Sequence, residues 1–228
     1  MSHRQNILRI KAVHQALGDL SRQVLFVGGA TVSLYADRPT GEVRPTDDVD
    51  ILIELTRYSG YAELEEQLRR RGFINDVDSR IICRYKIQGV VVDIMPTSGD
   101  VLGFTNRWYA EGFLNAMDLD LGQNLIIKVF QPPYFLASKM EAFKNRGGED
   151  GRTSSDFEDI TFVLNNRSMI WDELENAPQN VGVYLKEAFQ KIAESDLLYE
   201  WIGAHLDYSE QNRTSYIVGG LEQFIRYW

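Results

Sequence analysis

The chain has 228 residues, 44% of them hydrophobic and 11% aromatic, enough to bury the core of one ordinary domain or two small ones. Its net charge of −9 argues against a non-specific nucleic-acid-binding protein, because neutralisation of phosphates supplies most of that affinity. The single cysteine, Cys83, excludes an internal disulfide and a cysteine-based zinc site. Signal-peptide and membrane-spanning patterns are absent, so we expect a cytoplasmic protein that does not enter a membrane.

The first part of the chain alternates between predicted helices and strands. Apolar residues at helical spacing predict a helix over 5–20, and "QVLFVGG" (23–29) predicts a short buried strand that ends in paired glycines. The patterns that follow predict a short helix at 30–36, a loop at 37–45, a buried strand at 49–55, a helix at 61–72, a hairpin over 80–96 and a strand at 125–131.

Helical patterns dominate after residue 131. "PPYFLASKMEAFKNRGG" (132–148) opens with prolines and closes with glycines, as is typical of a helix. The next helix is expected in "SDFEDITFVL", with Ser155 and Glu158 as a capping box, and more helices follow within 171–228. The sequence therefore predicts an α+β (mixed α/β) fold. Its core, 1–131, is a mixed sheet flanked by helices, and its C-terminal region, 132–228, is α-helical.

Acidic residues crowd the start of the strand at 49–55, in "RPTDDVDILIEL" (44–55). Side chains on a strand alternate between its faces, so Asp48 and Asp50 share a face and Asp47 points the other way. Asp93 lies in the apolar run "VVVDIMP", where strand propensity disfavours it. If the two strands pair, Asp48, Asp50 and Asp93 converge, and their oxygens suit Mg²⁺ or Mn²⁺. Any one of them alone is more commonly a turn or capping residue, the role that we expect for Asp47.

The paired glycines Gly28 and Gly29 lie where a predicted strand passes into a helix. Bare backbone N–H groups at such a turn can hold a phosphate chain. A Gly-Gly pair by itself is typical of any tight turn. The order of strand, Gly-Gly, helix, loop and Asp-x-Asp strand favours phosphoryl or nucleotidyl transfer, in which metals bridge the triphosphate and the attacking oxygen.

"VGGATVSLYADRPTGEVRPTDDVDILI" resembles the signature of the nucleotidyltransferase (polymerase-β-like) superfamily: a Gly-Gly or Gly-Ser pair, a spacer, then Asp-x-Asp on a strand. "PPYFLASKMEAFKNRGGEDGRTSSDFEDI" resembles the second half of the AbiEii/AbiGii-type toxin nucleotidyltransferases, which carry a lysine on one helix and an aspartate pair on the next. The resemblance covers roughly residues 23–165. It implies a nucleotidyltransferase-type mixed sheet flanked by helices.

The resemblance also implies a catalytic set in the sheet. Asp48, Asp50 and Asp93 would bind the catalytic Mg²⁺ or Mn²⁺, and Asp93 could accept the proton of the attacking hydroxyl. Gly28 and Gly29 would hold the phosphates of an NTP substrate.

Further nucleotide contacts are implied outside that set. Many family members carry a serine after the first glycine, and its hydroxyl contacts phosphate; here Thr31 or Ser33 would substitute for it. Lys139 would meet the triphosphate, and Asp156 with Asp159 would order Lys139 or the acceptor.

The leading prediction is an enzyme that transfers NMP from an NTP to a hydroxyl of RNA, tRNA or a protein. The resemblance implies the toxin of a toxin–antitoxin system, with a cognate antitoxin protein as partner. An aminoglycoside-type nucleotidyltransferase with a small-molecule acceptor is a rival, because the acidity after residue 150 would suit a polycationic drug. Two further alternatives are a catalytically silent binding or antitoxin-like module, against which the three carboxylates argue, and a metal-dependent nuclease, which would leave Gly28, Gly29 and Lys139 without a role.

Overall fold

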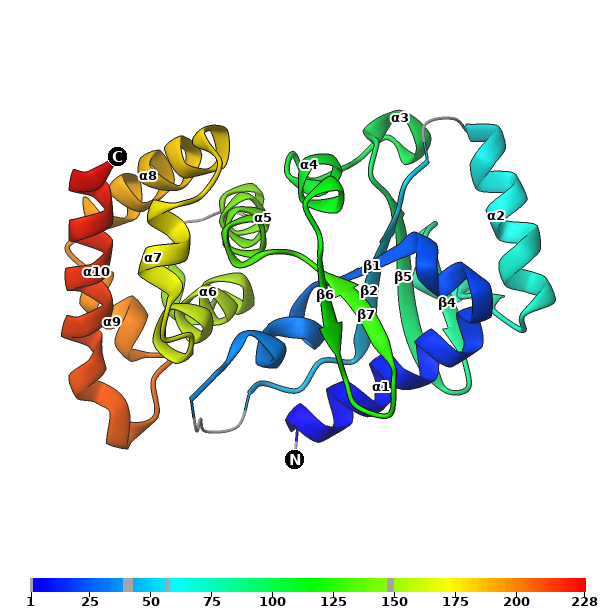
Figure 1. Ribbon diagram of the computed structural model, residues 1–228, viewed down its shortest axis with the longest axis horizontal. Coiled ribbons are helices and arrows are strands. Elements are labelled where there is room, and N and C mark those ends of the chain that lie inside the picture. Colours follow the sequence, from blue (N-terminus) through cyan, green and yellow to red (C-terminus); the bar gives the residue numbers. More distant parts are fainter. Residues whose placement is uncertain (1, 39–42, 56–57, 147–149) are drawn as a thin grey trace. The chain divides into compact units, whose positions relative to one another are not determined.

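The structure, a computed structural model, describes residues 2–38, 43–55, 58–146 and 150–228. It confirms the predicted fold class, with a seven-stranded mixed sheet flanked by helices and a C-terminal helical region (Figure 1). The chain divides into two compact units: Met1–Thr31 with Glu42–Gln131, and Val32–Gly41 with Pro132–Trp228. Across the described ranges, no helix combines the length and the apolar character needed to cross a membrane.

The first unit is built on a single sheet with the strand order β3-β4-β5-β2-β1-β7-β6. Strand β2 pairs antiparallel with β1 and parallel with β5, while β1 pairs parallel with β7. Strands β4 and β5 form one antiparallel hairpin and β6 and β7 another. The strands are β1 (Val24–Val27), β2 (Asp48–Ile53), β3 (Ile74–Asn75), β4 (Arg84–Ile87), β5 (Val90–Pro96), β6 (Met117–Asp120) and β7 (Ile126–Val129).

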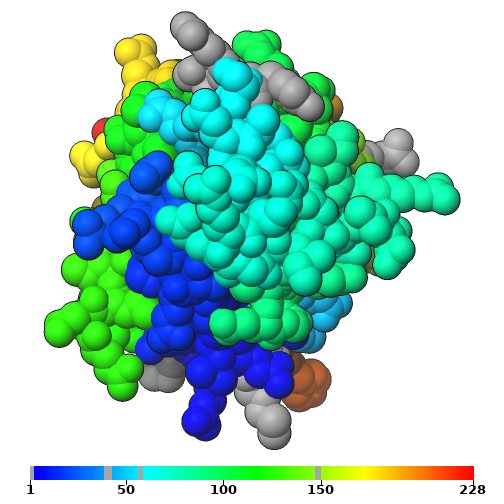
Figure 2. Space-filling view, turned by 90° about the vertical axis from the view of Figure 1, so that its right-hand side faces the viewer, coloured from blue at the N-terminus to red at the C-terminus, as the bar shows by residue number. Residues whose placement is uncertain are grey.

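The central strands are apolar because the sheet is covered. Strand β1 is buried along its whole length, and α1 (Ser2–Leu17) packs on β2 and β5, crossing the sheet in Figure 1. Figure 2 shows the side of this unit where α2 (Tyr58–Arg70), in cyan, and the segment that follows it form the surface. The remaining helices of the unit are η1 (Gly18–Gln23), η3 (Val77–Ser79), α3 (Gly99–Leu102) and α4 (Tyr109–Leu114).

The second unit is helical. Helix α5 (Pro132–Asn145) packs against α6 (Ser155–Asn166), α7 (Ile170–Glu175) and α8 (Gln179–Ala193). Helix α10 (Thr214–Tyr227) packs against α6, α7, α8 and α9 (Leu198–Gly203), and its apolar residues complete the core. The other elements are η4 (Gly151–Thr153) and η5 (Tyr208–Arg213); η2 (Gly29–Tyr35) carries the chain from the first unit into the second.

The start of α6 differs from the expectation by one residue. The backbone N–H of Phe157 donates to the Ser154 hydroxyl at 3.2 Å, so Ser154 is the N-cap. The expected capping box of Ser155 and Glu158 is therefore wrong, because adjacent serines leave the position of the cap open in the sequence. The glycines expected to end the preceding helix, at 147 and 148, lie outside the described residues.

Candidate metal centre

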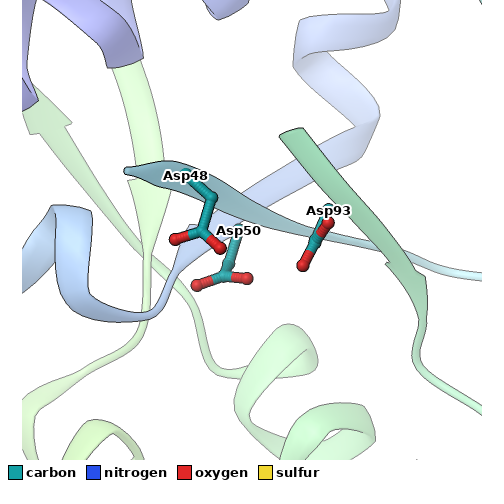
Figure 3. Close-up of side chains that lie close together, drawn as sticks. All are labelled: Asp48, Asp50 and Asp93. Carbon is teal, nitrogen blue, oxygen red and sulfur yellow. The ribbon is translucent and has the colours of Figure 1, made fainter. Parts of the chain in front are cut away.

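The sheet brings Asp48, Asp50 and Asp93 together. Strands β2 and β5 pair in the register that sets Asp50 opposite Asp93, as the sequence argument required. One carboxylate oxygen from each residue lies within 4.8 Å of the other two, and Figure 3 shows Asp48 and Asp50 on one strand with Asp93 beside them. Asp93 is buried and the other two are half-buried. Asp47, one residue earlier, is exposed and is not one of the cluster's three members.

The paired glycines have a packing reason that sequence reasoning did not foresee. Gly28 follows β1 with a φ of +72°, and a Cβ added there would lie 1.9 Å from Oδ2 of Asp50. A Cβ on Gly29 would lie 2.5 Å from a guanidinium nitrogen of Arg44 and 2.8 Å from Cγ2 of Thr46. Gly28 therefore needs glycine for both its positive φ and its contact with Asp50, while at Gly29 a Cβ would require the Arg44 and Thr46 side chains to shift.

Arg84, which sequence reasoning missed, completes the cluster. Its Nε and Nη2 donate to the two oxygens of Asp93 at 2.7 Å each, and Nη2 also donates to Oδ2 of Asp48 at 2.9 Å. The bidentate geometry is the one in which a guanidinium matches a carboxylate best. Arg84 therefore supplies a positive charge to two of the three candidate metal ligands.

The acidic cluster raises the pKa values of two neighbouring residues. Hydrogen bonding to Asp93, followed by the charges of Asp93, Asp48 and Asp50, raises the pKa of Arg84 above its usual value, so its guanidinium stays charged. Burial, with the nearby charges of Asp93 and Asp50, raises the pKa of the Cys83 thiol to about 11. The neighbouring thiol is thus protonated at neutral pH.

The cluster fits a hard divalent cation. Its donors are carboxylate oxygens, which Mg²⁺ and Mn²⁺ prefer. Opposite ligands of Mg²⁺ lie roughly 4 Å apart, since each stands about 2 Å from the ion. Carboxylates whose oxygens lie within 4.8 Å reach that spacing by small side-chain rotations. Asp48, Asp50 and Asp93 are therefore the residues that would hold the ion.

The expected phosphate-contacting hydroxyls lie in different surroundings. Thr31 is fully buried, and its hydroxyl donates to the Gly28 carbonyl at 2.9 Å, closing the turn after β1. Ser33 is buried within η2 and belongs to the second unit. Neither position adds an exposed hydroxyl to the Gly28–Gly29 turn, and a phosphate contact by either residue stays a prediction.

The remaining expected residues meet inside the second unit. The Lys139 ammonium on α5 lies 2.7 Å from Oδ2 of Asp159 and 3.2 Å from Oδ1 of Asp156, both on α6. Arg146 pairs with the other oxygen of Asp156 at 2.7 Å. Lys139 and both aspartates are buried, so the expected ordering of Lys139 by the aspartates has a direct structural counterpart. The contact of Lys139 with a triphosphate stays a prediction.

Comparison of the chain with models of known protein families and with curated proteins gave no match. The resemblance to nucleotidyltransferases therefore rests on the motif residues themselves.

Proposed function

We propose that this protein is a metal-dependent nucleotidyltransferase that transfers NMP from an NTP to an acceptor hydroxyl. The observation that carries the proposal is the convergence of Asp48, Asp50 and Asp93 next to the Gly28 turn. The order of these features along the chain, glycine turn first and Asp-x-Asp strand second, adds support from the sequence. A cytoplasmic location is part of the proposal, since NTPs are available there.

In the proposed reaction, an oxygen of the acceptor attacks the α-phosphorus of the NTP. The bond from that phosphorus to the oxygen that bridges it to the β-phosphorus breaks, and pyrophosphate leaves. A bound Mg²⁺ or Mn²⁺ would supply charge to the phosphates and lower the pKa of the attacking hydroxyl. Asp48 and Asp50 would orient the ion from β2, and a carboxylate oxygen of Asp93 would accept the hydroxyl proton.

The resemblance to AbiEii/AbiGii-type toxins supports RNA, tRNA or a protein as the acceptor, with a cognate antitoxin as partner. A small-molecule acceptor of the aminoglycoside type fits the same chemistry. A non-catalytic binding module is the second candidate function, and the Arg84 bridge favours it, because a guanidinium already pairs with Asp93 and Asp48. Transfer of label to an acceptor distinguishes the enzyme from the non-catalytic module, and the acceptor that is labelled distinguishes RNA or protein from a small molecule.

The test is incubation of the protein with Mg²⁺, each labelled NTP and total RNA, protein or aminoglycosides as acceptors. We expect the wild type to transfer label and Asp50→Asn to lose at least about a hundredfold in rate, because the substitution removes a metal-binding charge but keeps the shape. Asp47→Asn is the matched control, since Asp47 is an exposed neighbour outside the cluster, and it should keep full activity. Absence of transfer by the wild type with every acceptor, together with absence of NTP–Mg²⁺ binding by calorimetry, would contradict the proposal.

A further inference from the structure

Arg84 belongs to a row of charged residues that crosses three neighbouring strands. The β4–β5 hairpin pairs Arg84 with Asp93, and the parallel β2–β5 pairing sets Asp93 beside Asp50. The row therefore reads arginine, aspartate, aspartate from β4 to β2. Asp48 lies two residues from Asp50 on β2 and also bonds Arg84. The backbone pairing alone thus places the guanidinium beside the cluster.

The guanidinium is held firmly in this place. It makes three hydrogen bonds of 2.7 to 2.9 Å to Asp93 and Asp48. The side chain of Arg84 is 22% exposed and that of Asp93 only 12%, so water competes weakly for these bonds. Charge-assisted, bidentate bonds are the strong class of side-chain hydrogen bond. The acidic cluster is therefore organised by a cation that belongs to the protein.

A divalent ion at the cluster would draw on the carboxylates that Arg84 already bonds. Both oxygens of Asp93 and one oxygen of Asp48 accept hydrogen bonds from Arg84. A metal ion and a guanidinium on one carboxylate oxygen repel each other, and shielding from water strengthens that repulsion. Arg84 and the metal ion therefore compete for Asp93 and Asp48.

We propose that Arg84 is a built-in competitor of the metal ion: it holds the cluster together when metal is absent, and it leaves Asp93 and Asp48 when metal binds. Arg84 thereby sets the metal concentration at which the centre fills. This inference rests on the proposed function, since it takes the cluster as the metal centre. The proposed role of Arg84 is to position the carboxylates, and no step of the transfer reaction is assigned to this residue.

The test measures Mn²⁺ binding without nucleotide, from the electron paramagnetic resonance signal of the free ion. Arg84→Gln should lower the Mn²⁺ dissociation constant about tenfold, the factor expected when one competing hydrogen bond between charged groups is lost. Arg84→Lys should lower it by a smaller factor, because an ammonium keeps the charge but not the bidentate bond. Arg70→Gln is the matched control: it removes the same charge from the same unit, at a side chain that is 73% exposed and pairs with Glu66, and should leave the constant unchanged.

A second measurement follows thermal unfolding in EDTA and in Mn²⁺. Arg84→Gln should lower the melting temperature in EDTA, because Asp93 loses its partner while it stays buried. Mn²⁺ should restore it with a larger upward shift than in the wild type. If Arg84→Gln does not fold in EDTA, Arg84→Lys decides the matter by its Mn²⁺ affinity, which must exceed that of the wild type.

The outcomes separate this inference from the proposed function. Wild-type Mn²⁺ binding that is lost in Asp50→Asn but not tightened in either Arg84 variant overturns the role of Arg84 and leaves the metal centre standing. Mn²⁺ binding that is unchanged in Asp50→Asn, or absent from the wild type and every variant, overturns the metal centre and this inference together.

Discussion

At position 28 the Asp50 carboxylate leaves room for a hydrogen atom and nothing larger. Two separate demands meet there: a φ of +72°, which strains any residue with a Cβ, and the 1.9 Å approach of Oδ2 to the site of that Cβ. Gly89 in the β4–β5 turn has the first demand alone, with a φ of +79° and open space around its missing side chain. Substitutions at the two glycines therefore distinguish the effect of backbone strain, which both share, from the effect of displacing the Asp50 carboxylate, which occurs only at Gly28.

Gly28→Ala and Gly89→Ala should each destabilise the protein by about 1 kcal/mol or more, because each forces alanine into the left-handed region. Only Gly28→Ala should also weaken Mn²⁺ binding, by about tenfold. Its Cβ displaces the Asp50 carboxylate, and loss of a residue that orients a metal ligand costs affinity on that scale. Urea denaturation measures the first effect and Mn²⁺ titration the second. Equal Mn²⁺ affinities in the two variants would mean that Asp50 does not take part in metal binding.

Among the helices, α5 and α6 are joined by a buried ionic network rather than by apolar contact alone. Lys139 lies between Asp156 and Asp159, and the Asp159 side chain is 1% exposed. Removal of one partner from a buried pair leaves a charge without compensation, which costs more than the pair itself contributes.

Lys139→Met should therefore destabilise the second unit by about 3–5 kcal/mol, whether or not Lys139 has a role in catalysis. Lys144→Met, at an exposed position on the same helix, should change the free energy of unfolding by less than about 0.5 kcal/mol. Tryptophan fluorescence during urea denaturation measures both, since Trp171, Trp201 and Trp228 lie in this unit. A Lys139→Met protein with wild-type stability and no NTP binding would instead identify Lys139 as a ligand of the triphosphate.

The sequence contained more of the candidate metal centre than its pattern made obvious. The hairpin predicted over 80–96 turns at Gln88-Gly89, and a two-residue turn fixes the register of its strands. Arg84 stands four residues before Gln88 and Asp93 four after Gly89, so their pairing follows from the turn. The arginine was missed because a charged residue on a short strand usually points to solvent.

Other features had no local signal. The parallel pairing of β2 and β5 joins segments separated by α2 and the strands that follow it, so its register was stated as a condition rather than predicted. The burial of Lys139 has no signal in the sequence pattern, because all residues of the helix from Pro132 to Met140 are buried, polar and apolar alike. Strands β3 and β6 are short, and β6 carries two acidic residues, so neither has a clear strand pattern.

For the molecule as a whole, the two units carry separate reporters. The single cysteine, Cys83, lies in the first unit, and its buried thiol has a pKa raised to about 11. Because the thiolate is the reactive form, alkylation at neutral pH requires this region to open. Three of the four tryptophans, Trp171, Trp201 and Trp228, lie in the second unit.

Mn²⁺ at about a hundred times its dissociation constant should stabilise the first unit by about 2.7 kcal/mol, because it binds the folded cluster. The experiment uses Trp108→Phe, which leaves tryptophans only in the second unit. The urea midpoint for Cys83 alkylation should rise, and the urea midpoint for tryptophan fluorescence should rise by less. Chelation with EDTA should reverse the shift. Equal shifts in both midpoints would mean that the two units unfold as one.

The division of the chain bears on the order in which the protein can mature during synthesis. Strands β1 and β2 belong to one unit, yet the segment between them, Val32–Gly41, belongs to the other. In that segment the Tyr35 ring packs 4.4 Å from the Phe135 ring, measured between centroids, and the Tyr35 carbonyl accepts a bond from Arg167. During synthesis, the sheet of the first unit can therefore form before the helices that carry Phe135 and Arg167, the contacts of Tyr35, are translated. A release of the chain after Gln131 would remove Phe135 and Arg167 from Tyr35, so a segment that interrupts the first unit in the sequence depends on the C-terminal helices for these two contacts.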